Sequence, residues 1–196
     1  MKTINTSRTT TKWLATAALL AASLSSAWGN TPALSANAPA VSGGTVIHVV
    51  DGDTFDVSLS DRETYERLAA LASASESEDR HKRLRHLDDR QQSIRVRLAN
   101  VDTEESKHHD ASRNTEAGRH IATIMKMALE GQPVFAQCYD WGSYGRLICT
   151  LGMGSEGENG DVGYALIRDG YSEYVTYWGE NPFYHDAYQE AGNNRD

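Results

Sequence analysis

Two short acidic stretches of the chain carry oxygen ligands of the kind that divalent cations prefer. VVDGDTFDV contains Asp51 and Asp53, and VDTEES contains Asp102 and Glu105. Carboxylates are hard oxygen donors that suit Ca²⁺ or Mg²⁺, with waters in the remaining coordination positions. Asp-Gly between apolar runs is also typical of an ordinary hairpin turn. The first stretch is therefore half of a metal site only if the fold brings the second stretch to it.

Two arginines supply a complementary chemistry. Arg97 lies five residues before Asp102, and Arg146 follows the turn sequence DWGSYG. A guanidinium group can hold a phosphate through two parallel hydrogen bonds, and it stays charged. A phosphodiester held between a divalent ion and two arginines lacks only a base that activates water, for which Glu105 is the candidate. The combination predicts a metal-dependent phosphodiesterase.

Other kinds of metal site fit the sequence less well. The DGD stretch is not a helix-loop-helix calcium motif, because its fifth and twelfth positions would be Phe55 and Arg62. Histidines offer a competing transition-metal site, with His48 before the first acidic stretch and His108 and His109 after the second. Adjacent histidines on a polar loop are more often solvated, so oxygen ligands are favoured.

Alternating apolar residues predict strands that end at the acidic stretches. TVIHVV and TFDVSL flank the DGD turn within residues 44–59, and IRVRLANV at residues 94–101 contains Arg97. Residues 60–93 between them are highly charged, with leucines at helical spacing. They predict an inserted helical hairpin or a mobile charged excursion. Its basic run RHKRLRH is a candidate phosphate contact, although a solvated helix face is the commoner explanation.

The second half of the chain predicts a helix, a hairpin and two further helices. NTEAGRHIATIMKMALEG has an apolar stripe, a cap at Asn114 or Thr115 and a stop at Gly131. QPVFAQCYD and GRLICTLGM follow as a hairpin, then VGYALIRDG as a short helix. A last helix is predicted to begin with Asn181 and Pro182 in its cap and first-turn positions. This order suits a small closed antiparallel barrel with helices packed on it.

The N-terminal region predicts export. Residues 1–29 combine a basic start without acids, the apolar run WLATAALLAASL and small residues at a cleavage site, which is typical of a secretory signal peptide. The apolar run is too short to span a bilayer comfortably. Residues 30–43 are uncharged and contain proline, which predicts a flexible leader. We therefore expect a secreted or periplasmic monomer without stable membrane association after signal cleavage.

Charge and cysteine content limit the possible partners. The whole chain has a net charge of −8, and loss of three basic residues with the signal leaves 16 basic against 27 acidic residues, or −11. Nucleic acid would therefore be bound by a few placed cations and not by bulk charge. Cys138 and Cys149 flank the predicted hairpin turn. They form either a disulfide, which export would permit, or two buried thiols.

Five of these segments together resemble the staphylococcal nuclease (thermonuclease) family. They are VVDGDTFDV, RVRLANVDTEES, EAG near the start of the long helix, YGR in the hairpin and VGYALIRDGY. The resemblance covers most of residues 44–178 and implies an OB-fold, a five-stranded antiparallel barrel with about three helices. That domain would span residues 44–192 with the insertion 60–93. It further implies calcium-dependent hydrolysis of DNA and RNA that leaves 3′-phosphate ends.

The resemblance also implies a metal site. Asp53 and Asp102 would be direct Ca²⁺ ligands, and the carbonyl of Thr103 would be the third. Asp51 would be a supporting acid nearby. The family usually has proline where this chain has Glu104, so an additional acid lies beside the expected ligands.

The remaining roles are activation of water, binding of the phosphate and stacking on a nucleic-acid base. Glu105 would be the general base, and Arg97 and Arg146 would hold the phosphate and stabilise the charge of the transition state. Tyr144 would lie near the substrate phosphate, unless it only packs on its neighbours. Aromatic residues would stack on an exposed base or, alternatively, close the barrel. The candidates for that role are Tyr174, Tyr177 and Trp178.

Two rival functions use the same fold. A non-catalytic nucleic-acid-binding barrel would have little need of the full set of acids and arginines. A secreted structural domain stabilised by calcium would keep the acids but not the two arginines. The sequence therefore favours the nuclease.

Overall fold

The structure of the chain is a computed structural model that describes residues 41–107, 110–154 and 160–194. These residues belong to one structural unit, residues 34–196. The predicted signal peptide, most of the predicted leader, and His108 and His109 lie outside the described residues. Within the described ranges, no helix combines the length and the apolar character needed to cross a bilayer.

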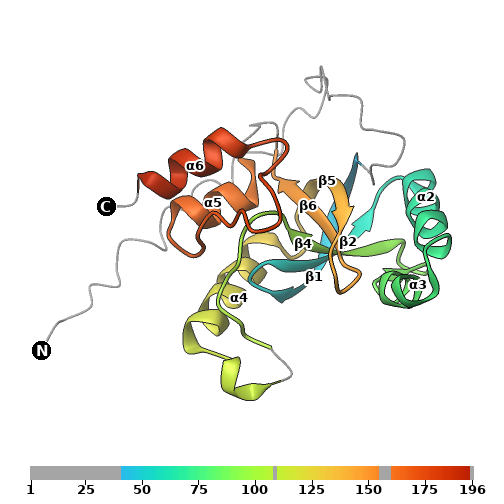
Figure 1. The fold of residues 1–196 in the computed structure, drawn as a ribbon, viewed down its shortest axis with the longest axis horizontal. Coiled ribbons are helices and arrows are strands. Elements are labelled where there is room, and N and C mark those ends of the chain that lie inside the picture. The colour runs from blue at the N-terminus through green and yellow to red at the C-terminus, as the bar shows by residue number, and fades with distance from the viewer. Residues whose placement is uncertain (1–40, 108–109, 155–159, 195–196) are drawn as a thin grey trace, which may run out of the picture. The chain divides into compact units, whose positions relative to one another are not determined.

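Six strands form one sheet that closes on itself (Figure 1). Their order is β2-β1-β5-β6-β4-β3, and an additional pairing of β2 with β4 closes five of them into a barrel. The bounds are β1 Val41–Asp51, β2 Thr54–Leu59, β3 Leu87–Asp88, β4 Ser93–Leu98, β5 Pro133–Trp141 and β6 Leu147–Gly152. The predicted fold class, a small OB-type barrel with helices packed on it, is confirmed.

Two details of the barrel differ from the prediction. β4 and β6 run parallel, with Val96 opposite Leu147, so the barrel is mixed and not antiparallel throughout. A helix and β5 lie between these two strands in the chain, which gives the long crossover that parallel strands require. β1 begins at Val41, three residues before the predicted domain start, because residues 41–43 pair with β5.

Five α-helices and one 3₁₀ turn are described. They are α2 Arg62–Ser73, α3 Ser77–Leu84, η1 Ala111–Arg113, α4 Glu116–Leu129, α5 Val162–Arg168 and α6 His185–Asn193. α4 contacts β1, and α5 contacts both β6 and α6 (Figure 1). Thr115 caps α4, since its side chain accepts a hydrogen bond from the backbone N–H of Gly118.

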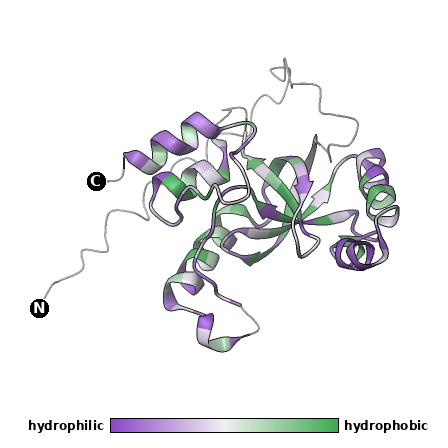
Figure 2. Ribbon diagram, viewed as in Figure 1, coloured by the Kyte–Doolittle hydropathy of each residue, from purple (hydrophilic) through white to green (hydrophobic). Residues whose placement is uncertain are grey.

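The insertion forms a helical hairpin, one of the two predicted alternatives. Asp61 caps α2 by accepting hydrogen bonds from the backbone N–H groups of Glu63 and Thr64. Tyr65 and Leu68 of α2 are buried in the barrel core, whereas α3 buries no residue. α3 is accordingly hydrophilic around most of its circumference (Figure 2). Only the first helix of the insertion contributes to the core.

The last helix starts later than predicted. α6 begins at His185, and Asn181 does not cap it. The side-chain oxygen of Asn181 instead accepts hydrogen bonds from the backbone N–H groups of Phe183 and Tyr184, which makes a turn before the helix. Asparagine before proline favours such a turn as readily as a helix start, because its short side chain bonds to the backbone two or three residues later.

Cys138 and Cys149 lie directly opposite each other on β5 and β6 and form a disulfide. The bond joins the two strands that flank the hairpin turn. Both residues are buried in the barrel core. The pairing therefore fixes the hairpin at its buried end, away from the turn.

A buried acid makes the stability of the C-terminal helices depend on pH. Asp161 caps α5 and accepts hydrogen bonds from the Tyr188 hydroxyl of α6 and from the backbone N–H of Tyr164. Burial raises the pKa of Asp161 from its ordinary value of 3.8 to about 6, although these hydrogen bonds oppose the shift. The folded state therefore binds the proton more tightly than the unfolded chain does.

We expect this proton to stabilise the fold below pH 6. The contribution is fully present below about pH 4 and is lost as the pH rises through about 6. The stability of the protein relative to an Asp161→Asn variant should fall by about 3 kcal/mol over that interval. Chemical denaturation of both proteins at a series of pH values measures it. A difference that does not change with pH would contradict the assignment.

Candidate active site

The two acidic stretches meet at one end of the barrel. The first is the turn between β1 and β2, and the second follows β4. Thr103 donates from its backbone N–H and from its hydroxyl to Oδ2 of Asp53, at 3.1 Å each. Ser106 donates from its hydroxyl to Oδ1 of Asp51 at 2.7 Å. Each aspartate of the turn therefore binds a different residue of the second stretch.

Glycine at position 52 allows this close approach. A Cβ on Gly52 would lie 2.6 Å from Oγ1 of Thr103 and 2.7 Å from Cγ2 of Ile121. Both distances are shorter than van der Waals contact, so any other residue would push the two stretches apart. The DGD sequence thus serves both as a tight turn and as a surface against which the second stretch packs.

Arg97 joins the two predicted metal ligands. Its Nη1 is 3.0 Å from Oδ2 of Asp53, and its Nη2 donates to Oδ1 of Asp102 at 2.8 Å. Nη1 also donates to the carbonyl of Val101 at 2.7 Å. The side chain of Asp53 is buried, whereas that of Asp102 is 64% exposed. The two carboxylates thus converge on a single cationic group.

This donor set fits a hard cation with few protein ligands. Two carboxylates face the guanidinium of Arg97, and the buried Thr103 donates to one of them, that of Asp53. Among the described residues, no three histidine, cysteine, aspartate or glutamate side chains form a metal-binding group. A cation here would need waters to complete its shell, as Ca²⁺ and Mg²⁺ accept.

The rival histidine site receives no support within the described residues. Nδ1 of His48 lies 3.4 Å from Oε1 of Glu130, the residue that follows α4. Asp51 is engaged with Ser106 and the backbone of Gly52. It therefore supports the second stretch.

Arg146 reaches the same site from the turn between β5 and β6. Its Nη1 donates to Oγ1 of Thr54 at 3.1 Å, and that hydroxyl donates to Oδ1 of Asp53 at 3.0 Å. Burial, followed by the charge of Arg97, lowers the pKa of Arg146, while Asp53 and Glu105 oppose the shift. Thr54 is a site residue that the sequence analysis did not identify, although it lies within the first acidic stretch, VVDGDTFDV.

The backbone of Glu105 lies on the first turn of α4. Its carbonyl accepts a hydrogen bond from the backbone N–H of Thr115 at 3.0 Å. A Cβ on Gly118 would overlap that carbonyl and would lie 2.7 Å from the carbonyl oxygen of Glu104. The glycine of the EAG segment is therefore required by this contact. Glu104, which replaces the usual proline, is exposed.

Three of the predicted aromatic residues are exposed, and one of them contacts Arg146. Tyr144 is 66% exposed, and the guanidinium of Arg146 is 5.7 Å from the centre of its ring. Tyr177 and Trp178 are 86% and 87% exposed and contact each other edge to face. Asn100 holds their loop to the end of β4, because its Nδ2 donates to the carbonyls of Val175 and Gly179 at 2.8 Å.

These exposures distinguish the predicted aromatic residues. Tyr174 is partly buried and packs edge to face on Tyr188, so it belongs to the helical layer. Tyr177 and Trp178 do not close the barrel, since most of their surface is open to solvent. They are available to stack on a base.

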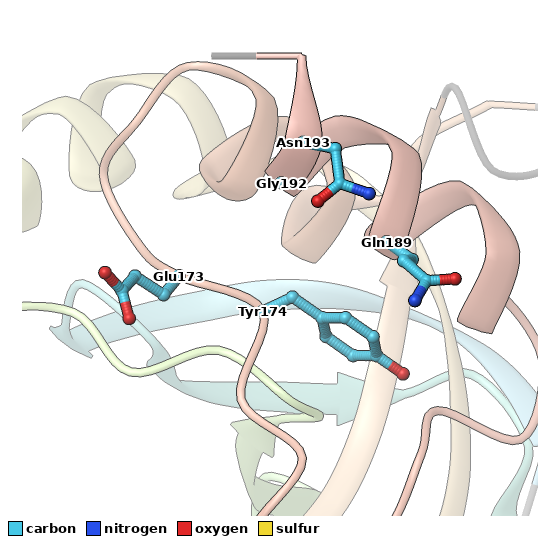
Figure 3. Close-up of a pocket in the computed structure, with 5 residues that line it drawn as sticks. All are labelled: Glu173, Tyr174, Gln189, Gly192 and Asn193. Atoms are coloured by element: carbon cyan, nitrogen blue, oxygen red, sulfur yellow. The ribbon is translucent and has the colours of Figure 1, made fainter.

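A surface pocket elsewhere shares no residue with this site. Figure 3 shows its lining, in which Glu173 and Tyr174 come from the segment before α6 and the others from α6 itself. The lining residues are Glu173, Tyr174, Gln189, Gly192 and Asn193. None of them is a predicted metal ligand, general base or phosphate contact, and Tyr174, a candidate for base stacking, packs on Tyr188 instead. The pocket is therefore not part of the candidate active site.

Comparison with known proteins identifies the family. Residues 95–195, more than half of the chain, match the family model described as staphylococcal nuclease homologue. The chain belongs to the staphylococcal nuclease family. No curated protein matches the chain. Membership indicates a nuclease or a nucleic-acid-binding protein, in a family whose members are generally hydrolases and typically depend on Ca²⁺.

The matched region contains only part of the site. Arg97, Asp102, Glu105 and Arg146 lie within the staphylococcal nuclease match, whereas Asp53 lies before it. The insertion separates the first two strands from the matched region. The hydrogen bonds from Thr103 to Asp53 join the matched region to the strands that precede the insertion.

Proposed function

We propose that the mature protein is an exported, calcium-dependent nuclease that hydrolyses phosphodiester bonds of DNA and RNA to 3′-phosphate products. The observation that carries this proposal is the convergence of two carboxylates and two arginines. Arg97 contacts both Asp53 and Asp102, and Arg146 reaches Asp53 through one hydroxyl. A module that only binds nucleic acid would have little need of this complete set.

Asp53, Asp102 and the carbonyl of Thr103 would hold the calcium ion. When bound, the ion would neutralise phosphate charge and make a neighbouring water easier to deprotonate. Arg97 occupies the same carboxylates in this structure and has a second donor edge for phosphate. On substrate binding, Arg97 would exchange the exposed carboxylate of Asp102 for phosphate oxygens.

Glu105 would act as the general base. It would accept a proton from the attacking water, whose oxygen bonds to phosphorus while the bond from phosphorus to the 5′ oxygen breaks. The leaving oxygen takes a proton from solvent and departs as a 5′-hydroxyl. Arg97 and Arg146 would stabilise the negative charge that develops on the phosphate oxygens. The products are then a 3′-phosphate and a free 5′ end.

The aromatic residues favour substrates with exposed bases. Tyr144 would lie beside the bound phosphate, on which Arg146 acts. Tyr177 and Trp178 would accept an unstacked base, since stacking on protein aromatics requires a base that has left its duplex. The protein would therefore cleave single-stranded or frayed nucleic acid faster than a stable duplex.

The proposed location outside the cytoplasm rests on residues 1–29, which have the features of a secretory signal. The disulfide between Cys138 and Cys149 supports it, because such bonds persist in oxidising compartments. The mature protein would be secreted or periplasmic and would act as a monomer.

A cleavage assay tests the proposed function. The mature protein is incubated with single-stranded DNA, circular plasmid and RNA, with Ca²⁺ or with a calcium chelator. We expect all three substrates to be degraded with Ca²⁺, single-stranded DNA fastest, and cleavage to stop with the chelator and resume when Ca²⁺ is restored. The new ends should carry 3′-phosphates, which block extension by a polymerase until a phosphatase removes them.

Three outcomes would contradict the proposal in whole or in part. Binding to nucleic acid without cleavage under every metal tested would favour the non-catalytic binding module. No interaction with nucleic acid would favour the structural domain. Cleavage that persists with the chelator would retain the nuclease but remove its calcium dependence.

A further inference from the structure

The insertion contacts the turn that carries Arg146 and Tyr144. Nη2 of Arg85 donates to the backbone carbonyl of Tyr144 at 3.2 Å, and Nε2 of His86 lies 3.1 Å from the same oxygen. A carbonyl oxygen has two lone pairs and can accept from both groups. We call these two side chains on the Tyr144 carbonyl the turn clamp.

The backbones of the turn and the insertion also touch. Gly145 has a φ of +79°, and a Cβ there would overlap the carbonyl group of Lys82 and lie 2.7 Å from the nitrogen of Arg83. The guanidinium of Arg83 lies 5.0 Å from the centre of the Trp141 ring, at the end of β5. The C-terminal end of α3 therefore lies along the whole turn and not only at the clamp.

The protonation state of His86 suits a donor to the carbonyl. Its Nδ1 is buried without a hydrogen-bond partner, and a proton there would be more costly than a lone pair. Nε2 lies 3.1 Å from the Tyr144 carbonyl, an oxygen that can only accept, so we place the proton on Nε2. Nε2 then cannot also accept a hydrogen bond from Nε of Arg85, which lies 3.3 Å away. Burial lowers the pKa of His86 to about 4, which leaves the ring neutral at pH 7.

These contacts give a role to the basic run RHKRLRH, which packing in the hydrophobic core does not explain. α3 buries none of its residues, and Lys82 is paired with Glu78 within the helix. The run RHKRLRH was expected to be a solvated face or a phosphate contact. In the structure, three of its residues lie against the hairpin turn, namely Arg83, Arg85 and His86.

Two internal hydrogen bonds close the turn. Residues 142–146 are joined by a hydrogen bond from Gly142 N–H to the Arg146 carbonyl and one from Gly145 N–H to the Gly142 carbonyl, both 2.8 Å. The disulfide fixes the hairpin only at its buried end. The contacts of Arg85 and His86 with the Tyr144 carbonyl add to these internal hydrogen bonds in holding the turn.

We propose that the insertion is a positioning element, in which the turn clamp holds residues 142–146 so that the guanidinium of Arg146 points to the scissile phosphate. The inference rests on the proposed nuclease function, in which Arg146 touches the substrate. Arg85 and His86 act through that turn and do not touch the phosphate themselves. Misplacing a catalytic group by about 1 Å costs up to about 10²-fold in rate.

A double-mutant cycle tests the inference. The clamp variant combines Arg85→Ala with His86→Ala and is made in the wild type and in an Arg146→Ala background. We expect the clamp variant to lower kcat for single-stranded DNA about tenfold, with KM changed less than about threefold. In the Arg146→Ala background the same change should lower kcat less than about twofold, because the group being positioned is absent.

Hydrogen–deuterium exchange supplies a readout that needs no catalysis. The amides of Gly142 and Gly145 should exchange at least about tenfold faster in the clamp variant. A matched control is Arg62→Ala, which breaks the ion pairs of Arg62 with Glu66 and Asp89 in the same insertion without touching the turn. This control should leave both kcat and the exchange of the turn amides unchanged.

The outcomes separate this inference from the proposed function. A wild-type protein that cleaves no nucleic acid would contradict the nuclease. An active wild type whose clamp variant retains kcat, or retains slow exchange at the turn, would overturn the positioning role alone. An equal loss of kcat in both backgrounds would also overturn it, since the clamp would then act on general stability.

Discussion

Replacing Arg146 with alanine is expected to lower kcat for single-stranded DNA about 10³-fold. The guanidinium lies beside Asp53 and Arg97, and burial lowers its pKa without removing its charge at neutral pH. A preorganised cation in a partly buried site stabilises developing phosphate charge far better than water does. Steady-state kinetics of the variant measure the loss, and Arg146→Lys should recover only a small part because lysine lacks the planar fork.

Arg95 provides the matched control for this experiment. It lies on β4 two residues before Arg97, and its Nε and Nη2 bind both oxygens of Asp56 at 2.7 Å and 2.8 Å. Its charge is already satisfied by that carboxylate, so we expect Arg95→Ala to keep kcat within about threefold and to cost only modest stability. Similar kcat losses in both arginine variants would show that Arg146 has no special role at the phosphate.

The local pattern of the sequence was sufficient to predict most elements. Alternation in TFDVSL and IRVRLANV predicted β2 and β4, and the apolar stripe of the long helix predicted α4. These patterns depend on which side of each element faces the core, and that information is contained within about ten neighbouring residues. The start of α6 was missed because Asn181 can cap a turn or a helix with the same side chain.

The contacts that assemble the site are not local, and the sequence predicted them less well. The convergence of Asp53 and Asp102 was a hypothesis that rested on the types of residue in the two acidic stretches and on the resemblance to a known family, because no local pattern reports it. The hydroxyl of Thr54 accepts a hydrogen bond from Arg146, 92 residues later in the chain, and donates one to Asp53, and no periodicity reports such a contact. The parallel pairing of β4 with β6 likewise depends on how α4 and β5 cross the barrel.

The insertion likewise has elements that the sequence predicts and a long-range contact that it does not. Its composition predicted helices correctly, because helical spacing and charge are local properties. The docking of Arg85 and His86 on the Tyr144 carbonyl joins positions 58 and 59 residues apart. A basic run has the same sequence whether it faces solvent, phosphate or another loop, so only the fold distinguishes these possibilities.

Gly118→Ala is expected to lower kcat about 10²-fold, although alanine is a better helix former than glycine. Gly118 lies in the first turn of α4, where a Cβ would overlap the carbonyl of Glu105. Both neighbouring groups are backbone, so the added methyl group can be accommodated only if the loop and the helix move apart. The hydrogen bond from Thr115 N–H to Glu105 would lengthen, and the base would be displaced from the attacking water.

Gly192→Ala is the matched control, because Gly192 also lies in a helix, α6, but with room for a methyl group. The nearest atoms to its Cβ, from Tyr174 and Ile167, would be 3.9 Å and 4.0 Å away, which is ordinary contact. That variant should be stabilised by about 0.5–1 kcal/mol through helix propensity and should keep full activity. Gly118→Ala should instead unfold at lower denaturant than the wild type and lose kcat. If both glycine variants were equally stable and active, the contact between α4 and the Glu105 loop would not position the base.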